Sequence, residues 1–376
     1  MATARADRIT LIEKIARVDW ILLLVAALAV GSGIVFIYSA TWTSDNPDLR
    51  DYYVKQLYHA LIGFGLCGTL ALIDYRALLK LAPLILLAGY GLLVAVLLFG
   101  TEVNNARSWF EWGFVRLQPA ELVKLALVLF LAWFLARRGE RAQNLWTFFW
   151  CCAATGACMA LVLKQPDLGS AMVFAPICFV MMFVAGVRRR WLLMGIILGA
   201  VAAVYAYLFL LEEYQRDRLT SFLYPERDPE GRGYHVLQSI KAVGSGGMLG
   251  RGFMEGKQSI LGFLPKDVSF SDFIFSVIGE EFGFLGSVIL LATFAIILLM
   301  GLNIAVRARD LRGSLVAIGV CTMFFTHIFE NIGMTIGVTP ITGIPLPFIS
   351  YGGTFVVTCL AGIGLLQSVH IHGRPR

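Results

Sequence analysis

Stretches of roughly 18–25 apolar residues recur along the whole chain, and 58% of its 376 residues are hydrophobic. At 1.5 Å per residue, each stretch is long enough to cross about 30 Å of hydrocarbon. A transmembrane barrel would instead show ten-residue segments of alternating hydrophobicity. The pattern therefore predicts an all-α polytopic membrane protein. The ten predicted transmembrane helices are residues 19–40, 55–73, 81–100, 119–136, 145–163, 170–187, 191–211, 273–301, 314–335 and 351–369.

The basic residues fall into groups that ten crossings place on one side of the membrane. These groups are Arg5, Arg8, Lys14 and Arg17, then Arg76 and Lys80, Arg137, Arg138 and Arg141, Arg188 to Arg190, Arg307, Arg309 and Arg312, and finally Arg374 and Arg376. By the positive-inside rule that side is the cytoplasm. We therefore expect a cytoplasmic (inner) membrane protein with both termini in the cytoplasm.

Composition excludes several classes of function. The net charge of +6 follows from membrane topology and does not indicate a nucleic-acid partner. All seven cysteines fall inside apolar stretches, so neither a disulfide framework nor a metal site is predicted. The predicted cytoplasmic connections are too short for a nucleotide-binding domain.

One connection stands out by its length. Residues 212–272 form an outer loop of about 60 residues between the seventh and eighth predicted helices, and so long a loop is uncommon unless it is functional. Within it, residues 234–243 predict an amphipathic helix, and a glycine-rich run follows at residues 244–252. We treat residues 1–376 as a single membrane domain.

Asp272 lies where this loop meets the eighth predicted helix. A carboxylate at the membrane surface is suited to act as a general base, because partial burial raises its pKa. An aspartate ahead of an apolar helix is equally typical of a helix N-cap. The residues alone leave both interpretations open.

Further charged residues lie near the outer ends of helices. Glu121 and Lys124 are three residues apart and share a helix face. They are suited either to hold a phosphate or to form a purely structural ion pair. Asp167 is placed to cap the sixth helix. Arg107, beside Trp109, is suited either to pair with a pyrophosphate or to anchor the chain at headgroup level.

The segment from Pro340 to Thr354 contains three prolines and three glycines before residue 354. It cannot form a plain helix. Irregular backbone at this depth is tolerated where it lines a cavity, so we expect it to do so.

These segments together resemble the SEDS family, whose name stands for shape, elongation, division and sporulation. The resemblance covers most of the chain, and the proline-rich run is closer to the elongation branch than to the division branch. It is carried by residues 106–109, 118–121 with Lys124, 165–169, 224–229, 238–239, 244–247, 272–275 with 280–281, and 340–353. Phe270 and Ser271 stand where the family commonly has His-Thr.

The resemblance implies a peptidoglycan glycosyltransferase that polymerises lipid II by inverting transfer on the outer face of the membrane. It implies a class B penicillin-binding protein as partner, alongside other membrane proteins of the elongation complex. The family's catalytic aspartate corresponds to Asp272. The predicted substrate-binding residues are Arg107, Glu121, Lys124, Gln165, Asp167, Gln238 and Ser350. No cofactor is implied beyond a divalent cation for which the sequence has no ligand motif.

Two other functions are compatible with the pattern. A lipid II flippase would also need a polar cavity between helices. The candidate residues cluster on the outer side rather than across the midplane, which favours the transferase. A membrane scaffold would leave that polar cluster unexplained.

Overall fold

The computed structural model describes residues 10–42, 47–103, 106–112, 115–210, 216, 222, 232–260, 263–264 and 268–373. The helices are α1 (Leu11–Ala16), α2 (Trp20–Trp42), α3 (Pro47–Arg50), α4 (Tyr52–Leu72), α5 (Tyr75–Phe99), α6 (Pro119–Arg138), η1 (Gly139–Gln143), α7 (Leu145–Leu163), α8 (Leu168–Val184), α9 (Arg189–Tyr205), η2 (Ala206–Leu210), α11 (Arg232–Ser245), α12 (Lys257–Ile260), α13 (Ile274–Arg307), α14 (Leu311–Thr335) and α15 (Gly353–Gly373). The strands are β1 (Thr101–Val103), β2 (Ala106–Trp112) and β3 (Val115–Leu117).

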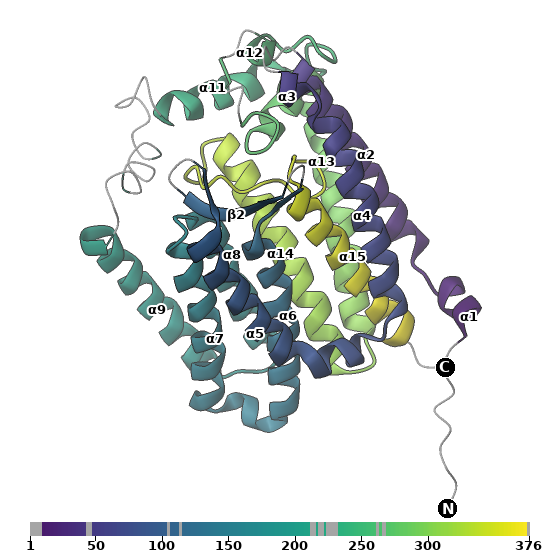
Figure 1. The fold of residues 1–376 in the computed structure, drawn as a ribbon, viewed down its shortest axis with the longest axis vertical. Coiled ribbons are helices and arrows are strands. Elements are labelled where there is room, and N and C mark those ends of the chain that lie inside the picture. The colour runs from purple at the N-terminus through teal and green to yellow at the C-terminus, as the bar shows by residue number, and fades with distance from the viewer. Residues whose placement is uncertain are drawn as a thin grey trace, which may run out of the picture.

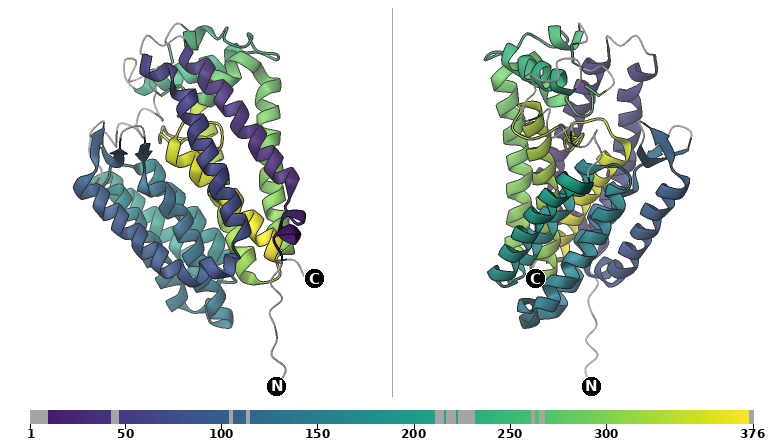
Figure 2. Two further views of the ribbon diagram at one scale, coloured as in Figure 1. Left: turned by 45° about the vertical axis from the view of Figure 1, so that its right-hand side comes forward. Right: turned by 90° about the vertical axis from the view of Figure 1, so that its left-hand side faces the viewer.

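The long helices form a bundle with two different ends (Figure 1). The sheet, α3, α11 and α12 lie at one end, which we call the loop end. The C-terminal end of α15, α1 and η1 lie at the other, the terminal end. Figure 2 shows the same division from two further directions.

Each of the ten predicted spans corresponds to a helix. Among the described residues, eight helices are long and apolar enough by themselves to cross a membrane. The two others are α8, which has only 17 residues, and α4, which carries Lys55, Gln56 and His59 in its first turns. The chain is thus a multi-pass membrane protein, and the exact number of ten crossings stays a prediction.

The core of the bundle is made by α6, α14 and α15. The most apolar part of α15 is 89% buried, whereas that of α9 is only 6% buried, so α9 lies at the periphery. Small residues allow close packing: a Cβ on Gly33 of α2 would lie 2.7 Å from the backbone of Ile349. This contact fixes α2 against the proline-rich run.

The three-stranded antiparallel sheet was not expected. No element was predicted between the helices at residues 81–100 and 119–136, but there β2 pairs with both β1 and β3. Strands of three residues carry no recognisable alternating pattern, and β2 differs from a polar loop only in its aromatic residues. The sheet provides part of the site described below.

The long outer loop is only partly described. The predicted helix at residues 234–243 is confirmed as α11, which has bounds of 232–245. The glycine-rich run after it packs on the first turns of α13. The first part of the predicted outer loop, residues 212–231, lies outside the described residues, apart from Arg216 and Phe222.

Candidate active site

A cavity of about 600 Å³ opens at the loop end of the bundle. Its walls come from the first turns of α4, from β2 and β3, from the starts of α6 and α8, from the segment before α13, and from the proline-rich run. Six charged residues line it: Lys55, Glu111, Arg116, Glu121, Asp167 and Asp272. Both signs of charge therefore face one enclosed space.

Asp272 lies in a turn that precedes α13. Its backbone N–H donates to the carbonyl of Val268 at 2.9 Å, and the helix N-cap position belongs to Phe273. The interpretation of Asp272 as the cap of this helix is therefore wrong. Because α13 begins only at Ile274, helical spacing does not relate Asp272 to Glu280, which instead accepts from the backbone of Gln258.

The proline-rich run holds this turn in place. Asn331 of α14 donates to the carbonyls of both Asp272 and Ile344, at 2.9 and 2.7 Å. The hydroxyl of Ser350 donates to the carbonyl of Ser271, and the N–H of Tyr351 to that of Phe270. The run lines the cavity, as predicted, and Ser350 acts there by joining two loops.

Gly343 of the run lies beside the carboxylate of Asp272. Its φ of +72° favours glycine, and a Cβ there would lie 3.4 Å from Oδ2 of Asp272. The carboxylate of Asp272 therefore packs against a backbone that has no side chain at this point.

Glu121 and Lys124 form the buried ion pair that their spacing predicted. The Lys124 ammonium lies 2.7 Å from Oε1 of Glu121 and 3.0 Å from Nε2 of His327 on α14. An ammonium has no acceptor, so Nε2 of His327 accepts and its Nδ1–H faces the carbonyl of Pro345 at 3.3 Å. Glu121 lines the cavity, whereas Lys124 is fully buried behind it. His327 thus connects Lys124 to the proline-rich run.

Asp167 has two roles at once. Its Oδ1 accepts from the N–H of Ser170 at 2.9 Å and so caps α8, and its Oδ2 accepts from the amide of Gln118 at 2.8 Å. It also lines the cavity. Capping and exposure to a ligand are therefore compatible here.

Five of the seven residues predicted to bind substrate lie outside the cavity wall: Lys124 and Ser350, described above, and the three that follow. Arg107 is half exposed and pairs with Glu102 at 3.1 Å. Gln165 is buried: its side-chain amide donates to the backbone carbonyl of Leu93, and its own backbone carbonyl accepts from the hydroxyl of Ser108. Gln238 is buried on α11.

Two cations that the sequence analysis did not single out do face the cavity. Lys55 lies 4.9 Å from the ring centroid of Tyr52, and Arg116 of β3 pairs with Glu111 of β2 at 2.8 Å. Lys55 was not predicted as a site residue because it stands at the start of a predicted span, where a lone lysine is typical of interfacial anchoring. Arg116 was not predicted as a site residue because the strand that positions it was not predicted.

Aromatic rings form the wall beside these cations. Tyr52 stacks on Tyr351 at 4.3 Å, and Phe270 packs edge-on against both rings. Phe270 thus contributes an apolar ring to this wall. It shapes the cavity but cannot carry a proton.

No group of three or more His, Cys, Asp or Glu residues suited to a metal ion occurs within the described ranges.

The family model for cell cycle proteins, which covers FtsW, RodA and SpoVE, matches residues 19–374. The peptidoglycan glycosyltransferase MrdB of Escherichia coli K12 is 36% identical over 98% of both chains, and stage V sporulation protein E of Bacillus subtilis is 35% identical over 95% of this chain and 98% of its own length. The peptidoglycan glycosyltransferase RodA of Treponema pallidum is 34% identical over 96% of this chain and 99% of its own length.

Solved structures agree. A chain from a peptidoglycan synthase complex that coordinates polymerization and crosslinking aligns with a TM-score of 0.80 at 33% identity, over 96% of this chain and 99% of that one. The rod shape determining protein RodA of Thermus thermophilus aligns with a TM-score of 0.71 at 31% identity, over 96% and 98%. The chain therefore belongs to the FtsW, RodA and SpoVE family of cell cycle proteins, the SEDS family, and is a peptidoglycan glycosyltransferase.

Proposed function

We propose that this enzyme polymerises lipid II into glycan strands at the outer face of the cytoplasmic membrane, with Asp272 as the general base. The loop end faces outward and both termini are cytoplasmic, because the basic groups gather at the terminal end. The observation that carries the proposal is the placement of Asp272 in one cavity with the cations Lys55 and Arg116.

The reaction needs a base and an anion site in one enclosure. Asp272 takes the proton from the acceptor 4-hydroxyl while that oxygen attacks the anomeric carbon of the donor. The bond to the pyrophosphate breaks as the glycosidic bond forms, so a single displacement inverts the anomeric centre. Lys55 and Arg116 stabilise the charge on the departing pyrophosphate.

The buried Glu121, Lys124 and His327 set supports this cavity from behind. Glu121 presents a carboxylate edge to the cavity, and Lys124 and His327 hold it against the proline-rich run. Among the predicted binding residues, Glu121 and Asp167 touch substrate, whereas Lys124, Gln165, Gln238 and Ser350 hold the walls. Arg107 lies at the rim, where it meets the lipid headgroup level.

A class B penicillin-binding protein is the partner that we propose, together with other membrane proteins of the elongation complex. The support is the similarity to a chain of a peptidoglycan synthase complex. Such a partner would crosslink the strands that this enzyme makes.

The test is polymerisation of lipid II by the purified protein, with and without the penicillin-binding partner. Asp272→Asn keeps the shape of the side chain and removes the base, so glycan synthesis is expected to fall about a hundredfold to ten-thousandfold. Asp310→Asn, the same change at the terminal end, is the matched control and keeps activity. Equal strand synthesis by wild type and Asp272→Asn would rule out the mechanism. Transport of labelled lipid II across vesicles without polymerisation would favour the flippase instead.

A further inference from the structure

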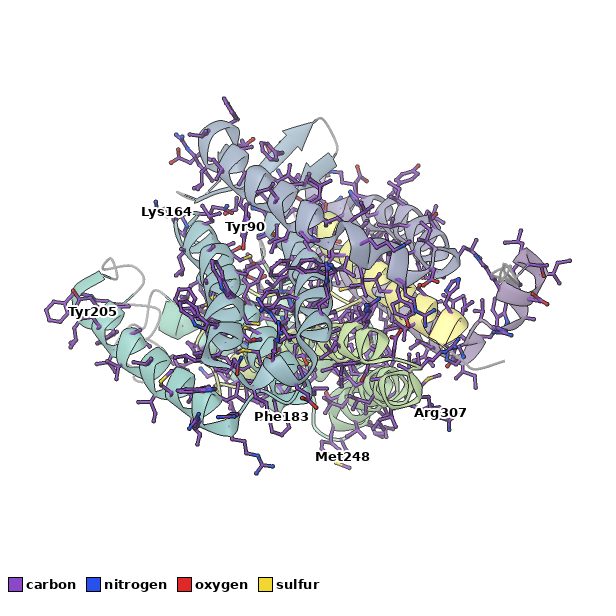
Figure 3. The ribbon with its side chains drawn as sticks, turned by 90° about the horizontal axis from the view of Figure 1, so that it is seen from below. Tyr90, Lys164, Phe183, Tyr205, Met248 and Arg307 are labelled. Atoms are coloured by element: carbon purple, nitrogen blue, oxygen red, sulfur yellow. The ribbon has the colours of Figure 1, made fainter. Side chains whose placement is uncertain are left out.

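A second, apolar groove of about 430 Å³ lies on the membrane-facing side of the bundle between α5, α6 and α7. From Pro83 to Tyr90 it runs about 10 Å along α5. The hydroxyl of Tyr90 donates to the carbonyl of Ala154 at 2.7 Å and closes the groove toward the loop end; Tyr90 is labelled in the view from the terminal end (Figure 3). The groove therefore lies in the half of the bilayer nearer the terminal end.

The walls of the groove are rings and small side chains. Phe130 and Phe134 of α6 stack at 5.9 Å and form one side, and Trp150 of α7, which is 51% exposed, stands opposite with Ala153 and Ala154. No polar side chain other than Tyr90 lines it. Within a bilayer such a surface is suited to an acyl chain.

Cations stand at the open end of the groove. The guanidinium of Arg138 lies 4.5 Å from the ring centroid of Phe134, and that of Arg137 lies 5.0 Å from that of Trp133. No carboxylate in the described part of the chain lies within ion-pair distance of either arginine. Lys80 lies three residues before Pro83, the first groove residue of α5, and shares its helix face.

From this combination we infer that the groove binds an anionic phospholipid of the cytoplasmic leaflet. One acyl chain lies between Phe134 and Trp150, and the phosphate lies between Arg137, Arg138 and Lys80. Basic pockets between transmembrane helices on the cytoplasmic side are suited to anionic headgroups, whereas a zwitterionic lipid would gain only the acyl contact. The inference rests on the proposed orientation of the chain but not on its reaction.

The test measures lipid binding to the full-length protein in detergent by native mass spectrometry. Phosphatidylglycerol and phosphatidylethanolamine with identical acyl chains are compared. Wild type is expected to bind phosphatidylglycerol roughly tenfold or more tightly, because each basic residue near the headgroup contributes about fivefold. The double variant Arg137→Gln/Arg138→Gln loses this preference and keeps the weaker binding of phosphatidylethanolamine.

Two matched controls separate this site from general charge and bulk effects. Arg307→Gln/Arg309→Gln removes two exposed arginines at the same end of the bundle and leaves the preference unchanged. Ala153→Trp fills the groove and lowers binding of both lipids, whereas Ala200→Trp on the exposed face of α9 lowers neither. Thermal unfolding midpoints in lipid-free detergent verify that each variant is folded.

The inference is overturned if Arg137→Gln/Arg138→Gln keeps the preference, or if the control pair loses it equally. It is also overturned if Ala153→Trp leaves lipid binding intact but releases a co-purifying transmembrane partner, since the groove would then hold a protein helix.

Discussion

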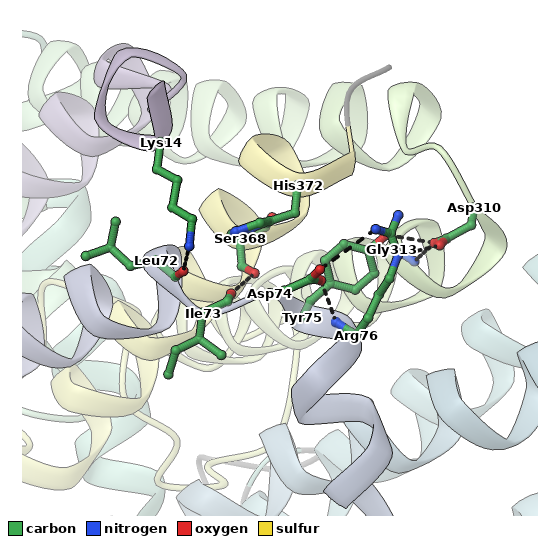
Figure 4. Close-up of polar contacts among 10 residues, drawn as sticks. All are labelled: Lys14, Leu72, Ile73, Asp74, Tyr75, Arg76, Asp310, Gly313, Ser368 and His372. Atoms are coloured by element: carbon green, nitrogen blue, oxygen red, sulfur yellow. Dashed lines mark hydrogen bonds and ion pairs between the residues drawn. The ribbon is translucent and has the colours of Figure 1, made fainter. Parts of the chain in front are cut away.

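Two aspartates near helix starts, Asp310 at the terminal end and Asp272 at the loop end, have opposite surroundings. Asp310 caps α14: its carboxylate accepts from the N–H of Gly313 at 2.9 Å, from the hydroxyl of Tyr75 at 2.8 Å and from Nε of Arg76 at 3.0 Å (Figure 4). Asp272 is not the N-cap of α13, and it lines a cavity that is also lined by cations from other elements.

Further hydrogen bonds join the helices around Asp310 (Figure 4). Lys14 of α1 donates to the carbonyl of Leu72, and Ser368 of α15 donates to the carbonyl of Ile73. With Asp310 ahead of α14, these contacts join α1, α14 and α15 to the connection between α4 and α5. Both ends also contain a buried polar atom without a hydrogen-bond partner within the described structure: Nε2 of His372 at the terminal end and Oε2 of Glu121 at the loop end. An unsatisfied buried atom is costly unless a ligand or water meets it. Only Glu121 lines the cavity, where a ligand can meet its carboxylate.

The largest effect on stability is expected from breaking the ion pair behind the cavity. Lys124→Met leaves Glu121 and His327 buried without their cation, which costs roughly 3–5 kcal/mol. Thermal unfolding in detergent measures this loss. The double variant Glu121→Gln/Lys124→Met regains part of it, because no unpaired charge remains. If Lys124→Met were as stable as wild type, the loop end would contribute nothing to the fold through this pair.

A smaller loss of stability is expected at the terminal end. Asp310→Ala removes a helix cap and the partner of the buried Tyr75 hydroxyl, which costs about 2 kcal/mol. The turnover number should stay unchanged, since Asp310 lies at the opposite end from the cavity. Unfolding midpoints and rates of lipid II polymerisation are measured for wild type and Asp310→Ala on the same preparations. A large drop in turnover with no loss of stability would reverse the roles that we assign to the two aspartates.

At the loop end, removing a cation should affect substrate and not stability. Lys55→Met is expected to lower kcat/KM for lipid II about tenfold, or 1.4 kcal/mol, with an unchanged unfolding midpoint. Arg107→Met, outside the cavity wall and paired with Glu102, is the comparison variant and should change kcat/KM less. If Lys55→Met and Arg107→Met had equal effects, the position of Lys55 in the cavity wall would give it no larger role toward lipid II than Arg107 has.

The smallest effect concerns acid stability. Burial alone would raise the pKa of Asp310, but the N–H of Gly313, the Tyr75 hydroxyl and Arg76 together outweigh it and hold the pKa below its ordinary value of 3.8. Its contribution is therefore complete above pH about 4 and is lost as the pH falls through the lowered pKa. The difference in unfolding midpoint between wild type and Asp310→Asn should shrink from pH 5 to pH 3. A difference that persists at pH 3 would contradict this account.

Much of the fold follows from hydrophobic length alone, and the ten apolar runs each correspond to a helix. The sequence could not distinguish residues that face the cavity from similar residues that only stabilise the fold. Asp272 and Asp310 both precede an apolar helix, and only the start of α13 at Ile274 distinguishes the first from a cap. Arg116 faces the cavity because of a strand too short to recognise, whereas Arg107, on the same sheet, faces its neighbour Glu102. Such differences depend on long-range packing rather than on local pattern.

The glycine-rich run after α11 is joined to α13 through main-chain groups. The N–H of Arg251 donates to the carbonyl of Glu280, that of Gly252 to Glu281, and that of Phe284 to Gly247, beside the kink at Gly283. Asp272 lies just ahead of the same helix. A movement of α11 would therefore be transmitted through main-chain hydrogen bonds to the start of α13, next to Asp272, the base that we propose. Substitution of ordinary residues in this run would leave that mechanical link intact, and only a bulkier residue at Gly246, Gly250 or Gly283, where a Cβ would meet backbone within 2.4 Å, would loosen it.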